Sequence, residues 1–199
     1  MKKIKISNNA NPNFIGAWNI GNKKLCDNII DYFENNKSLQ VEGESQSGVD
    51  INLKKTTDIS ISPKDLSLNS NIIFKEYISE LFKCYKDYVE TWPFLKKINS
   101  VDIGKFVIVK YKVGDHISNI HCERESLADS HRLFAWMTYL NDVENGGNTY
   151  FDNYDIKIKP ECGKTLIWPA EWTHTHSAQT ALSEKYIITG WLQFSLPGN

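Results

Sequence analysis

The chain has 199 residues, of which 41% are hydrophobic, and a formal net charge of −1. This length suffices for a single domain with a buried core, and the near-neutral charge gives no indication of binding to nucleic acid or to a membrane surface. Four cysteines lie far apart without a C-x-x-C motif, and the first residues lack the apolar segment of a signal peptide. We therefore predict a cytoplasmic protein with reduced thiols.

Two helices are predicted in the first half of the chain. Apolar residues recur every three to four positions over residues 21–36 and 69–92, as on the buried face of a helix. Ser70 or Asn71 is predicted to cap the second helix, and Pro93 to end it. In this longer helix the apolar stripe is formed by Phe74, Ile78, Leu81, Tyr85 and Val89.

The other segments favour short strands. In the first half, strands are expected at residues 1–7, 14–20 and 57–62, with a loop over residues 39–54. Residues 145–148, with two glycines, are typical of a tight turn that requires positive φ. In the second half, strands are expected at residues 105–112, 116–122, 133–140, 148–151, 156–158, 164–168 and 186–194.

This order of elements indicates a mainly β fold with α-helical braces, a double-stranded β-helix or jelly roll. We expect a single domain over residues 1–199. Residues 1–98 would form an N-terminal segment with the two bracing helices, and residues 99–199 a catalytic jelly-roll core.

A histidine and a glutamate two positions apart form the first candidate site. On a strand, positions i and i+2 project from the same face, so His121 and Glu123 can reach one ion. Glu125 shares that face but is two residues further away. A His-x-carboxylate pair occurs by chance on many solvated strands, so this pair needs further ligands to indicate a metal site.

A second histidine lies about fifty residues later, at His174 or His176. Two imidazoles and one carboxylate form the facial triad of non-haem Fe(II) oxygenases, which leaves metal positions open for other ligands. Both histidines share a face if the segment is extended, so alternation does not separate them. Lys185 begins an apolar strand. Because burying an unpaired cation is costly, its amine is expected either to lie in water at the strand end or to pair with a carboxylate that enters the barrel.

The segment from residue 111 to residue 194 resembles the 2-oxoglutarate/Fe(II)-dependent oxygenase superfamily, and within it the prolyl 4-hydroxylase group. In the family order the distal histidine precedes a lysine or arginine by nine or ten residues, which favours His176 over His174 because Lys185 follows His176 by nine. The resemblance rests on Tyr111 and Gly114, His121-Cys122-Glu123, Tyr139-Leu140-Asn141, the run from Gly146 to Phe151, His176 and Lys185.

The resemblance implies that His121, Glu123 and His176 hold Fe(II) as the catalytic metal, with 2-oxoglutarate and O₂ as co-substrates. It implies hydroxylation of a C–H bond, with succinate and CO₂ as products, and a prolyl residue in a peptide or protein as the first substrate class. Two departures from the family stand out. Glu123 replaces the usual aspartate, and residues 177–184 lack the glycine and proline common in prolyl hydroxylases.

The same resemblance assigns residues to the co-substrate. Lys185 would pair with the distal carboxylate of 2-oxoglutarate in a charge-assisted contact. Tyr111 and Tyr139 would donate hydroxyl hydrogen bonds to the same molecule, and Thr189, four residues after Lys185 on the same strand face, is a further candidate.

Several alternatives stay open at this point. The substrate is expected to be set by loops, at residues 38–63 and 125–131, so the same chemistry can act on another amino-acid side chain, a free amino acid or a small metabolite. From other classes, the alternatives are a non-catalytic cupin-like binding module and a zinc hydrolase. The complete ligand set argues against the first, and Lys185 has no role in the second. No oligomeric state follows from the sequence.

Other chemistry-bearing side chains are interpreted as scaffold. Cys122 is expected to point to the opposite face from the ligands and into the core. Arg124 and Arg132 are expected to be solvated. The tryptophans near the candidate site are expected in the core, although Trp172, near the distal histidine, can line the entrance: Trp168, Trp172 and Trp191.

Overall fold

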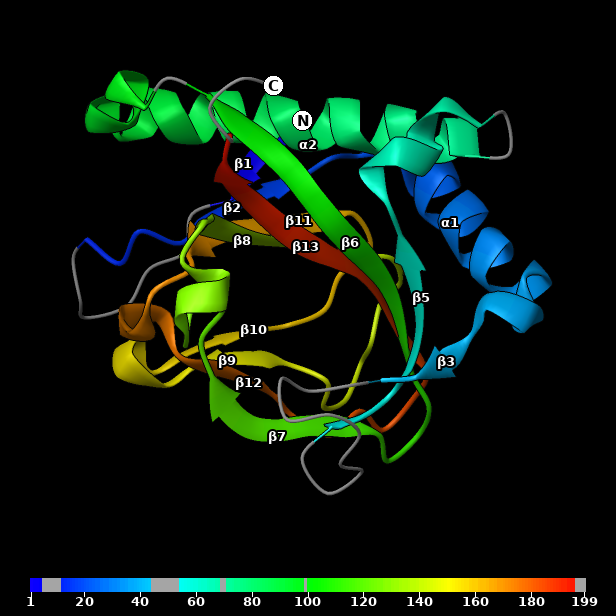
Figure 1. The fold of residues 1–199 in the computed structure, drawn as a ribbon. Helices are drawn as coiled ribbons and strands as arrows, with labels where there is room; N and C mark the ends of the chain where they lie inside the picture. The colour runs from blue at the N-terminus through cyan, green and yellow to red at the C-terminus, as the bar shows by residue number, and fades with distance from the viewer. Residues whose placement is uncertain (5–11, 44–53, 69–70, 99, 196–199) are drawn as a thin grey trace.

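The structure is a computed structural model that describes residues 1–4, 12–43, 54–68, 71–98 and 100–195. Two antiparallel sheets face each other, and two helices cover the outer face of the larger sheet (Figure 1). This double-sheet arrangement with helical braces is the predicted jelly roll. No helix in the described ranges is long and apolar enough to cross a membrane.

The larger sheet brings the first and last strands of the chain together. Its strand order is β1 (Lys2–Ile4), β2 (Gly16–Asn19), β11 (Lys164–Pro169), β8 (Arg132–Tyr139), β13 (Lys185–Phe194), β6 (Val101–Tyr111), β5 (Thr57–Ile61) and β3 (Val41–Glu42). The smaller sheet has the order β10 (Ile156–Ile158), β9 (Thr149–Phe151), β12 (His176–Ala178), β7 (His116–His121) and β4 (Lys54–Lys55).

The two predicted helices are α1 (Lys23–Asn35) and α2 (Ile72–Thr91). The side chain of Asn22 caps α1 by accepting a hydrogen bond from the backbone N–H of Leu25 at 3.1 Å. The cap predicted for α2 is not formed by Asn71, whose amide instead donates to the carbonyl of Asp65 at 2.9 Å. Ser70 lies outside the described residues. Within the described residues, 3-10 turns lie at Lys37–Leu39, Pro63–Ser67, Pro93–Lys97, Leu127–Asp129, Asp152–Tyr154 and Trp172–His174.

The buried face of α2 is rotated from the predicted stripe. Phe74 and Leu81 are buried as expected, but Ile78, Tyr85 and Val89 are only half-buried. Their places in the core are taken by Tyr77, Cys84 and Tyr88. The two tyrosines can be buried because their hydroxyls find partners, the hydroxyl of Thr138 at 2.7 Å and the carbonyl of Phe14 at 2.7 Å.

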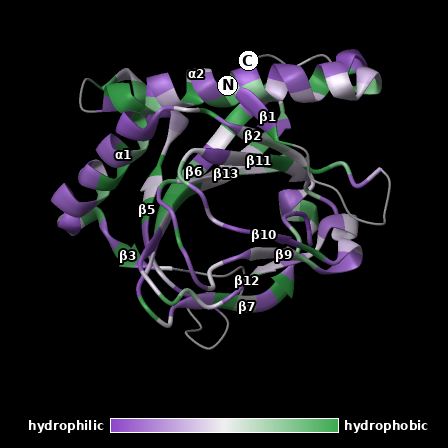
Figure 2. Cartoon of the chain, turned by 180° about the vertical axis from the view of Figure 1, so that it is seen from behind, coloured by the Kyte–Doolittle hydropathy of each residue, from purple (hydrophilic) through white to green (hydrophobic). Residues whose placement is uncertain are grey.

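The larger sheet separates two hydrophobic clusters. The first lies between this sheet and the helices and includes Phe33, Phe74 and Trp136, whereas the second lies between the two sheets and includes Met137 and Phe151. Because side chains alternate along a strand, central strands such as β8 contribute to both clusters, as its continuous apolar pattern predicts. Figure 2 shows the hydrophilic outer side of α1 on the periphery of this core.

The strand boundaries differ from the predictions at a few places. Strand β12 was not expected, and β6 begins four residues earlier than predicted. Strand β3 lies within the predicted loop 39–54, and β4 begins at its last residue. Part of the predicted strand 1–7 lies outside the described residues. The predicted turn is confirmed, since Gly146 and Gly147 have φ of 70° and 67°. All four cysteines are free thiols.

Candidate metal centre

The pairing of β7 with β12 brings two histidines together from segments far apart in the sequence. His121, the last residue of β7, lies opposite His176, the first residue of β12. Glu123 follows the end of β7, and its Oε1 lies 3.3 Å from Nε2 of His176 and 4.0 Å from Nε2 of His121. One ligand atom from each of these residues lies within 4.8 Å of the others, which is compatible with a single shared ion.

The two imidazoles are oriented as metal ligands. Nδ1 of His121 lies 2.9 Å from the carbonyl of Asn119, and Nδ1 of His176 lies 3.0 Å from the carbonyl of His174. A carbonyl can only accept, so each Nδ1 carries a proton, and Nε2, which faces Glu123, is the nitrogen with which each ring can bind a metal. A backbone carbonyl that orients the ring in this way is usual for a metal-binding histidine.

The local electrostatics favour the ligand forms of these side chains. Burial alone would raise the pKa of Glu123, but its hydrogen bond to His176 and the charge of the neighbouring histidines lower the pKa to about 2. Burial and the proximity of His176 lower the pKa of His121. The site therefore holds an ionised carboxylate beside a neutral imidazole at neutral pH, and the donor set fits a divalent metal such as Fe(II).

The structure separates the two candidate histidines of the WTHTH segment. His174 is also buried, but its Nε2 contacts the carbonyl of Asn13 at 2.9 Å and its Nδ1 contacts the hydroxyl of Thr173 at 2.9 Å. Both ring nitrogens are engaged away from Glu123. Glu125 is exposed, and its carboxylate accepts from the backbone N–H of Cys122.

Lys185 is 1% exposed, so it does not end in water. Its Nζ donates to the carbonyl of Gly147 at 3.0 Å and lies 3.9 Å from the ring centroid of Tyr111, directly across the β13–β6 ladder. Burial lowers the pKa of Lys185 to about 7. Among the residues that the structure describes, no carboxylate is within ion-pair distance of this amine.

The other residues assigned to the co-substrate differ in how their hydroxyls are engaged. Tyr139 is fully buried and donates to the hydroxyl of Thr149 at 2.6 Å. Thr189 donates to the carbonyl of Trp136 at 2.8 Å. The hydroxyl of Tyr111 has no hydrogen-bond partner within the described ranges.

Two residues that were interpreted as scaffold touch the carboxylate ligand. Trp191 is half-buried, and its Nε1 donates to Oε2 of Glu123 at 2.7 Å. The guanidinium of Arg132 lies 3.8 Å from the Trp191 ring centroid and donates to the carbonyl of Glu123 at 2.8 Å. The prediction of a solvated Arg132 was therefore wrong. Alternation along β13 could have indicated Trp191, because it lies on the strand face of Lys185.

Arg124 is also more constrained than predicted, since it donates to the carbonyls of Ser130 and Arg132 and pairs with Glu171. Trp172 is 71% exposed, which contradicts a place in the core. The predictions that Trp168 and Cys122 are buried are confirmed.

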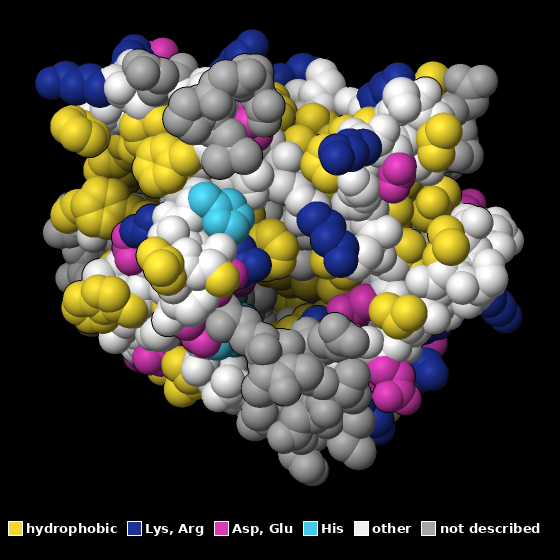
Figure 3. Space-filling view, viewed as in Figure 1, with side chains coloured by type: hydrophobic (Ala, Val, Ile, Leu, Met, Phe, Trp, Pro, Cys, Tyr) yellow, Lys and Arg dark blue, Asp and Glu magenta, His cyan; other side chains and the backbone are white. Residues whose placement is uncertain are grey.

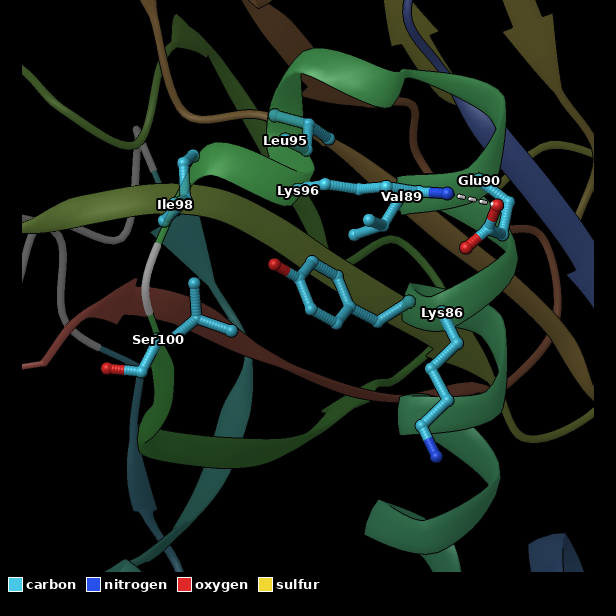
Figure 4. A pocket seen from close by; sticks show the side chains of 9 residues that line it. Lys86, Val89, Glu90, Leu95, Lys96, Ile98 and Ser100 are labelled. Carbon is cyan, nitrogen blue, oxygen red and sulfur yellow. Dashed lines mark hydrogen bonds and ion pairs between the residues drawn. The ribbon is translucent and has the colours of Figure 1, made fainter.

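The space between the sheets opens on one face of the molecule. Figure 3 shows a hollow there, with hydrophobic side chains visible at its back. A separate surface pocket lies at the C-terminal end of α2, lined by residues that include Tyr85, Lys86 and Lys96 (Figure 4). That pocket contains none of the three candidate metal ligands.

Comparisons with known proteins agree with the class that this site defines, a jelly roll with two histidines and one carboxylate. Residues 106–193 match the family model of the 2OG-Fe(II) oxygenase superfamily. The family resemblance seen in the sequence is thus confirmed over the segment that carries the site. The cofactors of this superfamily are Fe(II), 2-oxoglutarate and O₂, and the three residues fit that iron. No curated protein sequence matches the chain.

Solved prolyl hydroxylases have a similar fold. One, from Trichoplax adhaerens in complex with a hypoxia inducible factor peptide fragment, has a TM-score of 0.70 at 16% identity, over 92% of this chain and 85% of that chain. A viral collagen prolyl hydroxylase from Paramecium Bursaria Chlorella virus-1, in a 2OG complex, has a TM-score of 0.65 at 16% identity, over 95% and 100%. A Pseudomonas putida prolyl-4-hydroxylase has a TM-score of 0.69 at 14% identity, over 91% and 92%.

Proposed function

We propose that this protein is a 2-oxoglutarate-dependent dioxygenase that hydroxylates a C–H bond, with a prolyl residue of a peptide or protein as its substrate. One observation carries the proposal: two features lie between the same two sheets. The smaller sheet carries the cluster of two histidines and one carboxylate, and the larger sheet carries a buried lysine without a carboxylate partner in the described part of the chain.

In this proposal Nε2 of His121, Nε2 of His176 and Oε1 of Glu123 hold Fe(II). Fe(II) held by these residues would supply the reaction of O₂ with 2-oxoglutarate, in which one oxygen atom enters succinate with release of CO₂ and the other enters a substrate C–H bond. The side chains of Phe151 and Trp168 pack around His176, at ring-centroid distances of 5.4 Å and 5.1 Å. This packing lines one side of His176 with apolar rings.

Lys185 binds the distal carboxylate of 2-oxoglutarate. A buried ammonium is stable only beside an anion, and the dicarboxylic co-substrate supplies one in a low-dielectric space. The hydroxyl of Tyr111, at the ring over which the amine lies, donates a hydrogen bond to the same carboxylate. Tyr139 and Thr189 line the pocket, and their hydroxyls donate to Thr149 and to the carbonyl of Trp136.

The prolyl assignment is supported by the fold likeness to prolyl hydroxylases, one of which was solved with a peptide fragment. An exposed apolar rim near the metal centre also suits a peptide chain. Trp172, the first residue of the 3-10 turn that leads to His176, is 71% exposed, and Leu127, in the turn after Glu123, is 90% exposed. Large exposed apolar side chains of this kind are common contact points for peptides and proteins.

The test is visible absorption of the anaerobic protein with Fe(II), before and after addition of 2-oxoglutarate, followed by assays of succinate release and of oxygen incorporation into a panel of peptides. We expect a charge-transfer band that His176→Ala abolishes, and a mass gain of one oxygen on prolyl peptides. A band with succinate release but no gain on any prolyl peptide would assign the same chemistry to another substrate. Iron binding without a band would overturn the co-substrate assignment.

A further inference from the structure

We propose that Trp191 and Arg132 form a positioning pair that holds Glu123 in a one-oxygen binding mode toward the metal. This inference rests on the proposed metal site and concerns how the chain builds it. Neither residue is among the predicted ligands, and both contact Glu123, Trp191 at the carboxylate and Arg132 at the backbone carbonyl.

The two oxygens of the Glu123 carboxylate have different neighbours. Oε1 faces Nε2 of His176 at 3.3 Å and Nε2 of His121 at 4.0 Å. Oε2 accepts the indole N–H of Trp191 at 2.7 Å, which is short for a hydrogen bond from nitrogen. The indole therefore occupies one oxygen and leaves the other for the ion.

A glutamate ligand has a particular need for such a contact. Its side chain has one more rotatable bond than aspartate, so fixing it costs more conformational entropy, and its carboxylate can rotate to present both oxygens to an ion. Glu123 lies two residues beyond the end of β7, where its backbone N–H donates to the carbonyl of Ala170 at 3.1 Å. This bond holds the backbone of Glu123, and the Trp191 hydrogen bond holds its carboxylate.

Arg132 connects the side-chain restraint to the backbone. Its guanidinium lies 3.8 Å from the indole centroid, its Nη1 donates to the carbonyl of Glu123 at 2.8 Å, and its Nη2 pairs with Asp129 at 2.9 Å. One planar group thus holds both the backbone of the ligand and the ring that holds its carboxylate. A cation over the ring also draws electron density from the indole, which strengthens the N–H as a donor.

The position of Trp191 on β13 explains how the fold places it. Lys185, Thr189 and Trp191 are at odd positions on this strand and share its inner face, whereas Ile188 and Leu192 lie in the cluster under the helices. One strand therefore provides the proposed co-substrate lysine at one end and the proposed ligand-positioning tryptophan at the other.

The test compares two tryptophan-to-phenylalanine variants at the same site. Trp191→Phe removes the indole N–H that binds Glu123. Trp168→Phe is the matched control, because Trp168 is 2% exposed, lies against His176 and has a buried N–H without a hydrogen-bond partner in the described part of the chain. Both variants lose the same ring volume. The readout is the Kd for Co(II), from the visible absorption of the metal-free protein titrated without co-substrate.

We expect Trp191→Phe to raise the Co(II) Kd by about 10-fold or more and to change the shape of the Co(II) bands, and Trp168→Phe to raise the Kd by less than about 3-fold. Equal Kd values for Trp191→Phe and the parent would overturn the inference, and so would equal losses in the two variants, since the loss would then follow ring volume. A parent that binds no Co(II) would overturn the metal site itself.

Arg132→Lys provides an independent variant that leaves the tryptophan in place. Lysine keeps the charge beside Asp129 but loses the planar group that stacks on the indole and reaches the carbonyl of Glu123. We expect Co(II) binding weaker than in the parent with the same direction of band change as in Trp191→Phe, and thermal unfolding of the metal-free variants confirms that each is folded. Parent-like binding and bands in Arg132→Lys would remove Arg132 from the pair.

Discussion

Two lysines on adjacent strands of the larger sheet are placed alike but have different surroundings. Lys110 on β6 lies opposite Tyr186, and Lys185 on β13 lies opposite Tyr111. Each amine lies over the ring of its tyrosine, 5.1 Å from the centroid for Lys110 and 3.9 Å for Lys185. The same lysine–tyrosine arrangement thus occurs once on each face of the sheet.

The two lysines differ in whether a carboxylate lies beside the amine. Lys110, on the helix side, pairs with Glu34 at 2.8 Å and Glu184 at 3.2 Å, and although burial lowers its pKa, these hydrogen bonds raise it above its ordinary value. Lys185, between the sheets, meets no carboxylate in the described part of the chain, and burial lowers its pKa to about 7. The lysine on one face has its anionic partners, and for the lysine on the other face we propose that the dicarboxylic co-substrate supplies the anion.

The largest expected effect comes from removing each lysine in turn. Lys185→Met should weaken 2-oxoglutarate binding by about 30-fold to 1,000-fold, because truncating one partner of a buried charge pair costs roughly 2–4 kcal/mol. Lys110→Met, the matched control on the other face, should leave the affinity within about 2-fold of the parent. The measurement is calorimetric titration of the metal-loaded protein with 2-oxoglutarate. Similar losses in both variants would contradict the comparison.

The next effect is the pH dependence of co-substrate binding. Because the pKa of Lys185 is lowered to about 7 in the free protein, the amine must take up a proton to pair with a carboxylate at higher pH. The Kd for 2-oxoglutarate should be constant below pH 7 and rise by up to about 10-fold per pH unit above it.

Lys185→Arg is the control for this profile, since the guanidinium stays charged over the whole range. Its Kd, whatever its absolute value, should vary little between pH 7 and pH 9. Parallel profiles for the parent and the arginine variant would assign the pH dependence to other groups.

The same lysine should affect the stability of the ligand-free protein. Its pKa is lowered on folding from 10.5 to about 7, so between these values the unfolded chain binds more protons and the free energy of unfolding rises with pH. Below pH 7 the buried charged amine destabilises the folded state by its full amount, and above pH 10.5 it no longer does. Relative to Lys185→Met, the parent should gain about 1–2 kcal/mol between pH 7.5 and pH 9 in urea unfolding. A constant difference would show that the amine is already solvated or paired.

These contrasts also show what the sequence could predict. The helices and most strands follow from periodicity and alternation, which are local in the chain. The union of His121, Glu123 and His176 follows from the ordered motifs that the chain shares with the family it resembles. The β7 strand ends at His121, yet the i, i+2 argument still placed Glu123 beside it, because the chain remains extended enough for both side chains to reach one point.

Alternation could not separate His174 from His176, but the spacing to Lys185 favoured His176, and the hydrogen bond of His174 to Asn13, 161 residues away, agrees with that choice. The features that were missed depend on partners that are distant in the sequence. Trp191 was interpreted as core because its partner Glu123 is 68 residues away. The buried face of α2 rotated because the hydroxyl of Tyr77 meets Thr138 on β8, a contact that no helical pattern contains.

The smallest expected effect separates the two tyrosines that were assigned to the co-substrate. Tyr139→Phe removes a donor that is satisfied by Thr149 at 2.6 Å, so it should lower the free energy of unfolding by about 1 kcal/mol and change the 2-oxoglutarate Kd by less than about 3-fold. Tyr111→Phe removes a hydroxyl without a partner in the described residues and keeps the ring under Lys185. It should leave unfolding unchanged and weaken 2-oxoglutarate binding by about 5-fold to 10-fold. The measurements are 2-oxoglutarate titration and urea unfolding of both variants. If Tyr111 binds the co-substrate, Tyr111→Phe changes the Kd and Tyr139→Phe changes the stability. The opposite result would place the co-substrate beside Tyr139.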